Sequence, residues 1–230
     1  PELSLLISTR QQTLDVPVDG TRINLRPLSQ TQQFDIAKAL RGDAGVRMLD
    51  QARRTAGVRE LVTIPLYLKA LLALPEGTPF PTTKEEVLRR FVSVHEEDAL
   101  RAETLSEVTY GLHQRFLEGL AVTANCIANT TIPKAIARKS VSATECALVA
   151  EEQITEKPQP TTVLEALVSH HLLLRDGDPA GYSFQHQQFQ EWYASHFVGG
   201  LMTSIGDSAS HNRLKEDVLN QPVWEESVLF

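Results

Sequence analysis

The sequence predicts a mainly helical fold, in which a helical bundle is followed by a winged-helix domain. Helix-capping patterns recur before segments whose apolar residues have helical spacing. Farther along, two strand-like runs flank a turn rich in Asp, Gly and Pro, which is typical of a hairpin. Two more strand-like runs lie at the start of the sequence and are expected to be the end of a sheet.

The composition is that of an ordinary folded protein. The 230 residues are 42% hydrophobic and 22% charged, which is enough to bury a substantial core. Lys and Arg number 22 against 29 Asp and Glu, a net charge of −7, and this sign opposes binding to a nucleic acid. We therefore expect no nucleic-acid partner.

Cysteine content and apolar runs bear on where the protein works. Cys126 and Cys146 match no metal-ligand spacing and are too few to stabilise a small secreted fold, so a reducing cytoplasm is expected. Even the most apolar stretch, residues 62–75, is interrupted by Pro65 and Lys69 and falls short of the roughly 18 residues that span a membrane. No membrane partner is expected.

Residues 1–28 contain the two strand-like runs. LSLLIS is a short apolar run, typical of a buried strand in a parallel sheet. After a turn at Asp19 and Gly20, residues 21–29 alternate, with Ile23 and Leu25 on one face. A buried strand needs neighbours, so the chain is expected to be an internal piece of a longer protein whose remaining strands lie upstream.

Residues 29–103 have a helical pattern. Ser29 and Gln32 form a capping box before the first helix, and Gly42 supplies its stop. A second helix is expected over about 48–57, and a third begins at Pro65, since proline is tolerated at a first helical position. Another capping box, Thr83 with Glu86, precedes a fourth helix.

Residues 104–205 are expected to form the winged-helix domain. A longer helix comes first, with one apolar face formed by Val108, Leu112, Phe116, Leu117 and Leu120. A short helix should follow Pro133, and two more should begin at the capping patterns Ser142 with Glu145 and Thr162 with Glu165.

The hairpin is expected around residues 176–181, and another helix should follow it. In that helix the aromatic residues Phe189, Trp192, Tyr193 and Phe197 are spaced as core residues of a helix. Residues 206–230 are expected to begin a further helical region.

Four segments resemble motifs of one known family. LLISTR, LRPLS, IPLYLKALL and YSFQHQQFQEWYAS occur in the order and rough spacing of NACHT ATPases, within the STAND class of signalling ATPases. This resemblance implies that residues 1–28 end a P-loop nucleotide-binding domain of the α/β class. Residues 29–103 would then be the family's helical domain and residues 104–205 its winged-helix domain.

The resemblance also implies three cofactor-binding residues. Arg10 ends a segment that looks like the sensor-1 strand, where a guanidinium faces the terminal phosphate of the nucleotide. Pro65 occupies the position of a proline that lies beside the adenine. His186 occupies the position of a histidine that contacts the β-phosphate, and it falls at a helix start, where backbone N–H groups favour an anion. The implied cofactor is ADP or ATP with Mg²⁺.

The sequence departs from the family in what it lacks. It contains no G-x-x-x-x-G-K-[ST] motif (Walker A), and no apolar strand that ends in acidic residues (Walker B). Both are expected before Pro1. ATP hydrolysis is a property of the implied complete protein, and this piece alone is expected neither to hydrolyse ATP nor to bind nucleotide tightly.

The resulting hypothesis is a nucleotide-controlled conformational switch, in defence or stress signalling. Its partners would be the upstream nucleotide-binding domain, downstream sensor repeats and, on activation, further copies of the same protein. Two alternatives stay open. One is a helical adaptor without nucleotide, and the other is a winged-helix regulator of DNA, although the expected reading helix contains Glu165 and no Lys or Arg.

Overall fold

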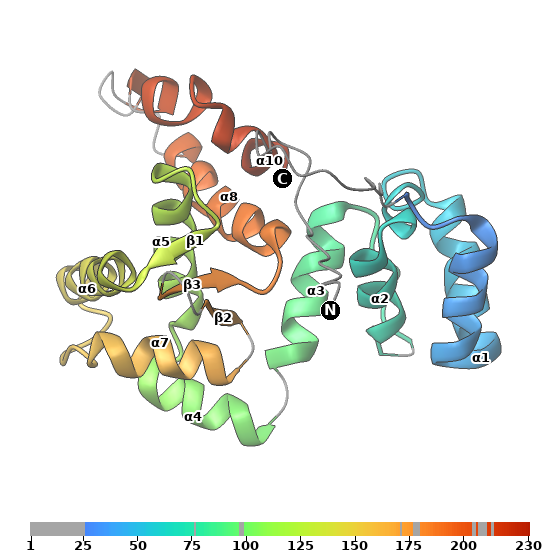
Figure 1. Cartoon of the computed structure of the whole chain (residues 1–230), viewed down its shortest axis with the longest axis horizontal. Coiled ribbons are helices and arrows are strands. Elements are labelled where there is room, and N and C mark those ends of the chain that lie inside the picture. Colours follow the sequence, from blue (N-terminus) through green and yellow to red (C-terminus); the bar gives the residue numbers. More distant parts are fainter. Residues whose placement is uncertain are drawn as a thin grey trace, which may run out of the picture.

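The computed structural model describes residues 26–75, 77–96, 99–170, 172–176, 180–203, 206, 211–212 and 214–230; the side chains of 93–102 and 176 are outside this description. The chain forms two groups of elements and a C-terminal segment (Figure 1). We call α1 to α3 the N-terminal group and the elements from α4 to α8 the C-terminal group. The expected strands within residues 1–25, and Arg10 with them, lie outside the described residues.

The N-terminal group consists of helices α1 (Gln30–Arg54), η1 (Leu61–Thr63), α2 (Pro65–Ala73) and α3 (Lys84–Glu96). In the C-terminal group the order is α4 (Ala99–Thr109), α5 (His113–Cys126), β1 (Thr131–Pro133), α6 (Lys134–Ala150), α7 (Pro160–Ser169), β2 (Leu173–Asp176), β3 (Gly181–Phe184) and α8 (Gln187–Thr203). The C-terminal segment contains η2 (Leu214–Leu219), which is a π-helix, η3 (Pro222–Trp224) and α10 (Glu225–Val228).

Helix α1 begins and breaks where the sequence predicts. Ser29 and Gln32 exchange both hydrogen bonds of the capping box. At Gly42 the backbone is left-handed, with φ 57°, a conformation that glycine adopts without a Cβ penalty. The helix kinks there, so the expected two helices are confirmed as two halves of α1.

Helix α2 starts with Pro65 at its first position, as predicted. Its other end is held by α1, because the Arg41 guanidinium donates hydrogen bonds to the carbonyl oxygens of Leu72, at 3.0 Å, and Leu74, at 2.5 Å. A cation at a helix C-terminus also complements the helix dipole. This contact connects α1 with α2.

The N-terminus of α3 is capped by Thr82, Thr83 and Glu86. The Glu86 N–H donates to Thr83 Oγ1 at 3.1 Å, which confirms half of the predicted box. The Glu86 carboxylate accepts hydrogen bonds from Thr82, and not from Thr83. These bonds, first of all the one from the Thr82 backbone N–H, lower the pKa of Glu86.

The expectation of one long helix through Val108 and Phe116 is wrong. Helix α4 ends at Thr109, and Tyr110 (φ 54°) and Gly111 (φ 73°) both adopt left-handed conformations. The Gly111 N–H then donates to Ser106 O at 2.9 Å, as in a helix C-terminal cap. The boundary expected after residue 103 lies inside α4, and α4 packs against α7.

Two further capping predictions are wrong. Helix α6 runs unbroken from Lys134 to Ala150, so Ser142 and Glu145 lie inside it, and Glu145 is buried. Helix α7 begins at Pro160, so Thr162 is already helical. A Ser or Thr three residues before a Glu also occurs inside helices. There the backbone N–H groups already donate to the carbonyl oxygens four residues earlier, so they do not donate to a capping side chain.

Strands β1, β3 and β2 form an antiparallel sheet in that order. The predicted hairpin is confirmed by the pairing of β2 with β3, in which Leu174 is opposite Ser183. Strand β1, which the sequence did not predict, pairs with β3, with Ile132 opposite Tyr182. Glycine is needed at position 181, because a Cβ there would lie 2.7 Å from the Ile132 carbonyl oxygen.

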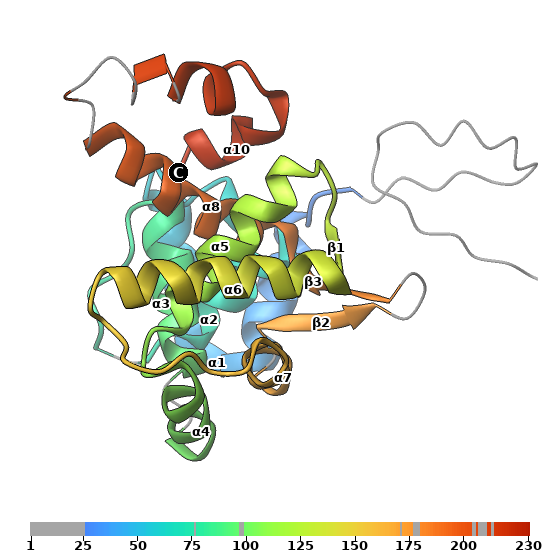
Figure 2. The ribbon, with the colours of Figure 1, turned by 90° about the vertical axis from the view of Figure 1, so that its left-hand side faces the viewer.

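Helix α8 lies at the centre of the molecule. It packs against α5 on one side, touches α3 on the other, and carries α10 above it (Figure 1). Figure 2 shows α6 crossing in front of α5, with the sheet beside them. Phe189, Trp192 and Tyr193 are buried, as predicted for core residues. The predicted mainly helical fold is thus confirmed, and it includes one small sheet.

Candidate functional site

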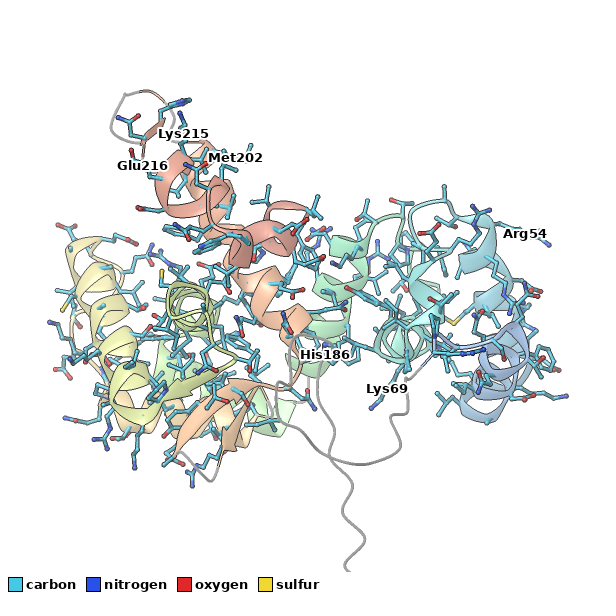
Figure 3. All side chains as sticks on the ribbon, turned by 45° about the horizontal axis from the view of Figure 1, so that its top comes forward. Arg54, Lys69, His186, Met202, Lys215 and Glu216 are labelled. Carbon is cyan, nitrogen blue, oxygen red and sulfur yellow. The ribbon has the colours of Figure 1, made fainter. Side chains whose placement is uncertain are left out.

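The N-terminus of α8 carries the residue that the resemblance selects most specifically. His186 directly precedes α8 and is half-buried. Its Nδ1 accepts a long hydrogen bond, 3.4 Å, from the Gln188 N–H. The imidazole therefore occupies the position of a helix cap, where unpaired backbone N–H groups point outward. Figure 3 shows His186 at the end of α8 that lies next to the N-terminal group.

The other two predicted site residues are Pro65 and Arg10, and no described contact joins either of them to His186. Pro65 is exposed at the first position of α2, where it has a sufficient structural reason. Arg10 lies outside the described residues. A nucleotide site formed by all three residues stays a prediction.

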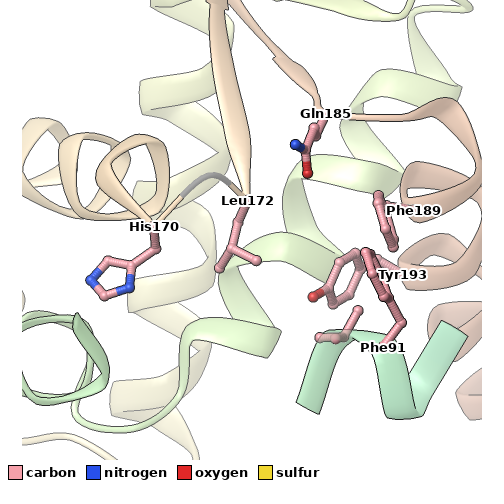
Figure 4. Close-up of a pocket in the computed structure, with 7 residues that line it drawn as sticks. Phe91, His170, Leu172, Gln185, Phe189 and Tyr193 are labelled. Carbon is pink, nitrogen blue, oxygen red and sulfur yellow. The ribbon is translucent and has the colours of Figure 1, made fainter. Parts of the chain in front are cut away.

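An aromatic contact joins the two groups beside His186. Phe91 of α3 stacks on Phe189 of α8, with ring centroids 5.8 Å apart and planes at 6°. Figure 4 shows these rings and Tyr193 close together, with His170 pointing away on the far side. The space that these residues line is about 20 Å³, room for one water molecule and far below the roughly 300 Å³ of a ligand pocket.

A phenol and two carboxylates lie in the same contact region, which we call the seam. It comprises the stacked rings of Phe91 and Phe189, and Tyr67 of α2 with the carboxylates of Glu191 on α8 and Glu226 on α10, whose charges act on it. Tyr67 is fully buried, and its hydroxyl has no hydrogen-bond partner among the described residues. Burial, and then the charges of Glu191 and Glu226, raise the pKa of Tyr67.

Two residues of the C-terminal segment, Glu226 of α10 and Phe230 after it, contact α3. Glu226 forms an ion pair with Lys84 of α3, with 3.4 Å between Nζ and Oε2. The same ammonium lies 3.8 Å from the centroid of the Phe230 ring, close enough for a cation–π interaction. The ion pair is partly exposed, so it contributes little to stability by itself.

A buried polar chain links α8, α5 and α10. Gln190 Nε2 donates to Asn125 Oδ1 at 2.8 Å, and Asn125 Nδ2 donates to Ser227 Oγ at 3.3 Å. All three residues are buried. Satisfied buried amides specify one packing arrangement, because a different arrangement would leave them unpaired.

The C-terminal group carries a network of charged side chains. His196 Nδ1 lies 2.9 Å from Glu118 Oε1, and Arg115 connects Glu118 to Glu151. The hydrogen bond from Arg115 lowers the pKa of Glu151. A histidine–carboxylate pair is one part of a nucleophilic site, but the described hydrogen bonds join His196 to no serine, threonine or cysteine.

Metal, DNA and membrane binding gain no support in the described part of the chain. No group of three potential metal ligands occurs among these residues. The exposed residues of α7 are Thr162, Glu165 and Ser169, and Glu165 pairs with Arg175 of β2. None of the described helices has the length and apolar character needed to cross a membrane.

Comparison with known proteins adds no family to these observations. No protein-family model matches the sequence, and no curated protein is significantly similar to it. The resemblance to NACHT ATPases therefore rests on the four segments alone.

Sequence reasoning missed most residues of the seam. Tyr67 lies within the apolar run PLYLKALL and Glu191 among aromatic residues, where each was assigned only to a helix. A polar side chain on the buried face of a helix is the signal that could have identified them. Their partners lie on other elements, and helical spacing says nothing about those.

Proposed function

We propose that this chain is the helical and winged-helix part of a nucleotide-controlled switch in a NACHT-type signalling ATPase. The observation that carries the proposal is the position of His186, between the hairpin and α8, at the end of α8 that borders the seam. A helix N-terminus is suited to a phosphate.

The order of elements supports the winged-helix part of the proposal. A winged helix has three helices and a hairpin, and a short strand between its first two helices joins the sheet. Here α5, β1, α6, α7 and the β2–β3 hairpin follow one another, and the sheet order is β1-β3-β2. This agrees with that topology.

The hydrogen bond at His186 supports a phosphate-binding role. A neutral imidazole whose Nδ1 accepts a hydrogen bond carries its proton on Nε2. Nε2–H is a donor, as a phosphate oxygen requires, and the dipole of α8 adds to the attraction for an anion. In the proposed closed state, His186 connects the C-terminal group to the β-phosphate of ADP.

The seam supports a switch more than a permanent contact. A permanent interface satisfies its buried polar groups, and an unsatisfied hydroxyl costs about 1–3 kcal/mol. The Tyr67 hydroxyl has no partner among the described residues, and the carboxylates of Glu191 and Glu226 act on it from the other elements of the seam. A second arrangement that hydrates the Tyr67 hydroxyl would recover this penalty, which narrows the free-energy gap between the two arrangements.

In the proposed mechanism, ADP lies between an upstream P-loop domain and the two groups of this chain. Exchange for ATP with Mg²⁺ breaks the His186 contact, and the two groups separate. Nucleotide biases the two arrangements by binding them with different affinity. Oligomerisation of the separated form, a trigger from downstream repeats and action in the cytoplasm complete the proposal.

Nucleotide content of the complete protein tests this proposal. ADP should be retained through purification by the unmutated protein and lost by the His186→Ala variant. His211→Ala is the matched control, because His211 is exposed in the C-terminal segment, and it should retain ADP. A complete protein that binds no adenine nucleotide under any condition would refute the proposal.

The adaptor alternative is favoured by one observation. Residues 218–222, 224, 225, 228 and 229 line an open groove of about 420 Å³, and Leu219 and Leu229 are exposed along it. An exposed apolar groove is typical of a protein-binding surface. Under this alternative the His186→Ala variant would behave like the control, and binding of a partner would depend on Leu219 and Leu229.

A further inference from the structure

One short segment touches both groups of the molecule. We call residues 224–230 the strap. Through Glu226 and Phe230 it contacts Lys84, at the N-terminus of α3. Through Ser227 it contacts Asn125 of α5. Figure 1 shows α10 above α8, on the side toward the N-terminal group.

The inward face of the strap is anchored to the C-terminal group. Trp224 is buried and its ring lies 5.8 Å from that of Phe197 on α8. Ser227 is buried at the end of the Gln190–Asn125 chain. The strap therefore moves with α8 and holds the N-terminal group from there.

The link to the N-terminal group is weaker than this anchor. Lys84 and Glu226 have side chains that are 25% and 55% exposed, and water and salt screen such a pair. The cation–π contact with Phe230 depends on the same ammonium. One lysine thus carries both contacts, and a change of charge at position 84 or 226 should release them together.

Part of the strap stays accessible. Val228 and Leu229 are 40% and 70% exposed, respectively. The Lys84 contacts lie at the partly exposed Glu226 and at Phe230, so they can break while Trp224 and Ser227 stay buried.

We propose that the strap is an autoinhibitory latch, which keeps the N-terminal group against α8 through Lys84 and whose release allows the seam to open. This latch acts through the chain's own residues and requires no nucleotide, and it rests on the proposed function in one respect, the opening of the seam. Release should separate the two groups while each stays folded.

The latch is tested by measuring the distance between the two groups in variants that reverse the charge at position 84, at position 226, or at both. The background is a chain whose Cys126 and Cys146 are replaced by serine. Spin labels are attached at Lys69→Cys on α2 and Lys139→Cys on α6, which are both exposed positions. The distance between the labels reports the separation of the two groups. Lys84→Glu and Glu226→Lys each convert the attraction into a repulsion. Each single variant should raise the population of longer distances about fivefold, and the double variant should restore the original distribution.

The outcomes separate the latch from a merely structural role. Circular dichroism should show unchanged helix content in all three variants, and Glu225→Lys, a neighbouring exposed carboxylate, should leave the distances unchanged. The proposal is overturned if the single variants keep the original distance distribution. It is also overturned if the double variant opens as far as the single variants do, because the pairing of Lys84 with Glu226 would then not matter.

Discussion

Tyr67 places a phenol hydroxyl inside the seam without a hydrogen bond to any described residue. Replacing Tyr67 with Phe removes this unsatisfied group and keeps the buried ring. We expect the free energy of unfolding to rise by about 1 kcal/mol, the lower end of the penalty for such a group. Urea unfolding measures it, with Tyr110→Phe as a control at a residue that is 49% exposed. A loss of stability in Tyr67→Phe would mean that the hydroxyl has a partner.

Glu145 gives the fold a pH dependence of its own. It is 3% exposed on α6, and burial raises its pKa from the usual 4.5, although Lys157 partly opposes this. The folded state therefore binds the proton more tightly than the unfolded state, so stability falls as pH rises from 4.5 through the folded pKa. Glu145→Gln should remove this loss.

The expected gain of Glu145→Gln is absent below pH 4.5 and grows above it. Unfolding free energies of both proteins across pH 4 to 7 check this, and Glu156→Gln, at an exposed position of the α6–α7 loop, should show no such trend. A constant difference across the pH range would contradict the assignment.

Substitution of three helix glycines by alanine should change the stability of the protein by different amounts. A Cβ at Gly45 would lie 2.2 Å from the Ala37 carbonyl oxygen, whereas one at Gly42 or Gly199 meets nothing within 4 Å. Gly45→Ala should therefore cost at least 2 kcal/mol, roughly the upper half of common mutational effects. Gly42→Ala should cost about 1–3 kcal/mol, because residues with a Cβ rarely adopt its backbone angles of φ 57° and ψ −140°. Gly199→Ala should stabilise α8 by about 0.5 kcal/mol.

Thermal unfolding of the three variants checks this order. If Gly45→Ala is as stable as Gly199→Ala, the close approach of the two halves of α1 is wrong. The comparison needs no second protein, because Gly199→Ala is an internal control for helix propensity.

Elements with local signals were predicted from the sequence. The capping box at Ser29, the break at Gly42 and the start of α2 at Pro65 depend only on neighbouring residues. The separation of α4 from α5 was missed because Tyr110 has a left-handed backbone conformation. A tyrosine in the sequence does not predict that conformation. Strand β1 is three residues long and exists through its pairing with β3, so no local pattern reveals it.

The site was less predictable than the fold for the same reason. Position in the sequence was enough to place His186 at the start of α8. The seam depends on which helices meet, and its residues come from α2, α3, α8 and α10. Apolar periodicity predicts which face of each helix is buried, but it does not predict which other helix covers that face.

At the scale of the whole molecule, the chain lacks the phosphate-binding loop and the acidic strand that phosphoryl transfer requires. We expect the isolated 230-residue chain to release no phosphate from ATP above the buffer rate. A phosphate-release assay with Mg²⁺ measures this. Turnover that survives purification and is lost in the His196→Ala variant would instead point to the His196–Glu118 pair as a catalytic site.

The dissociation rate of ADP from the complete protein tests the central claim most directly. A hydrogen bond from His186 to the β-phosphate contributes about 1–3 kcal/mol to the ADP form. His186→Ala should therefore release ADP about 5- to 150-fold faster and melt, without nucleotide, at the temperature of the unmutated protein. Phe189→Ala, which loses a buried ring, should instead melt earlier in both states. If His186→Ala melts early and releases ADP at the unmutated rate, the histidine is a packing residue and the account is contradicted.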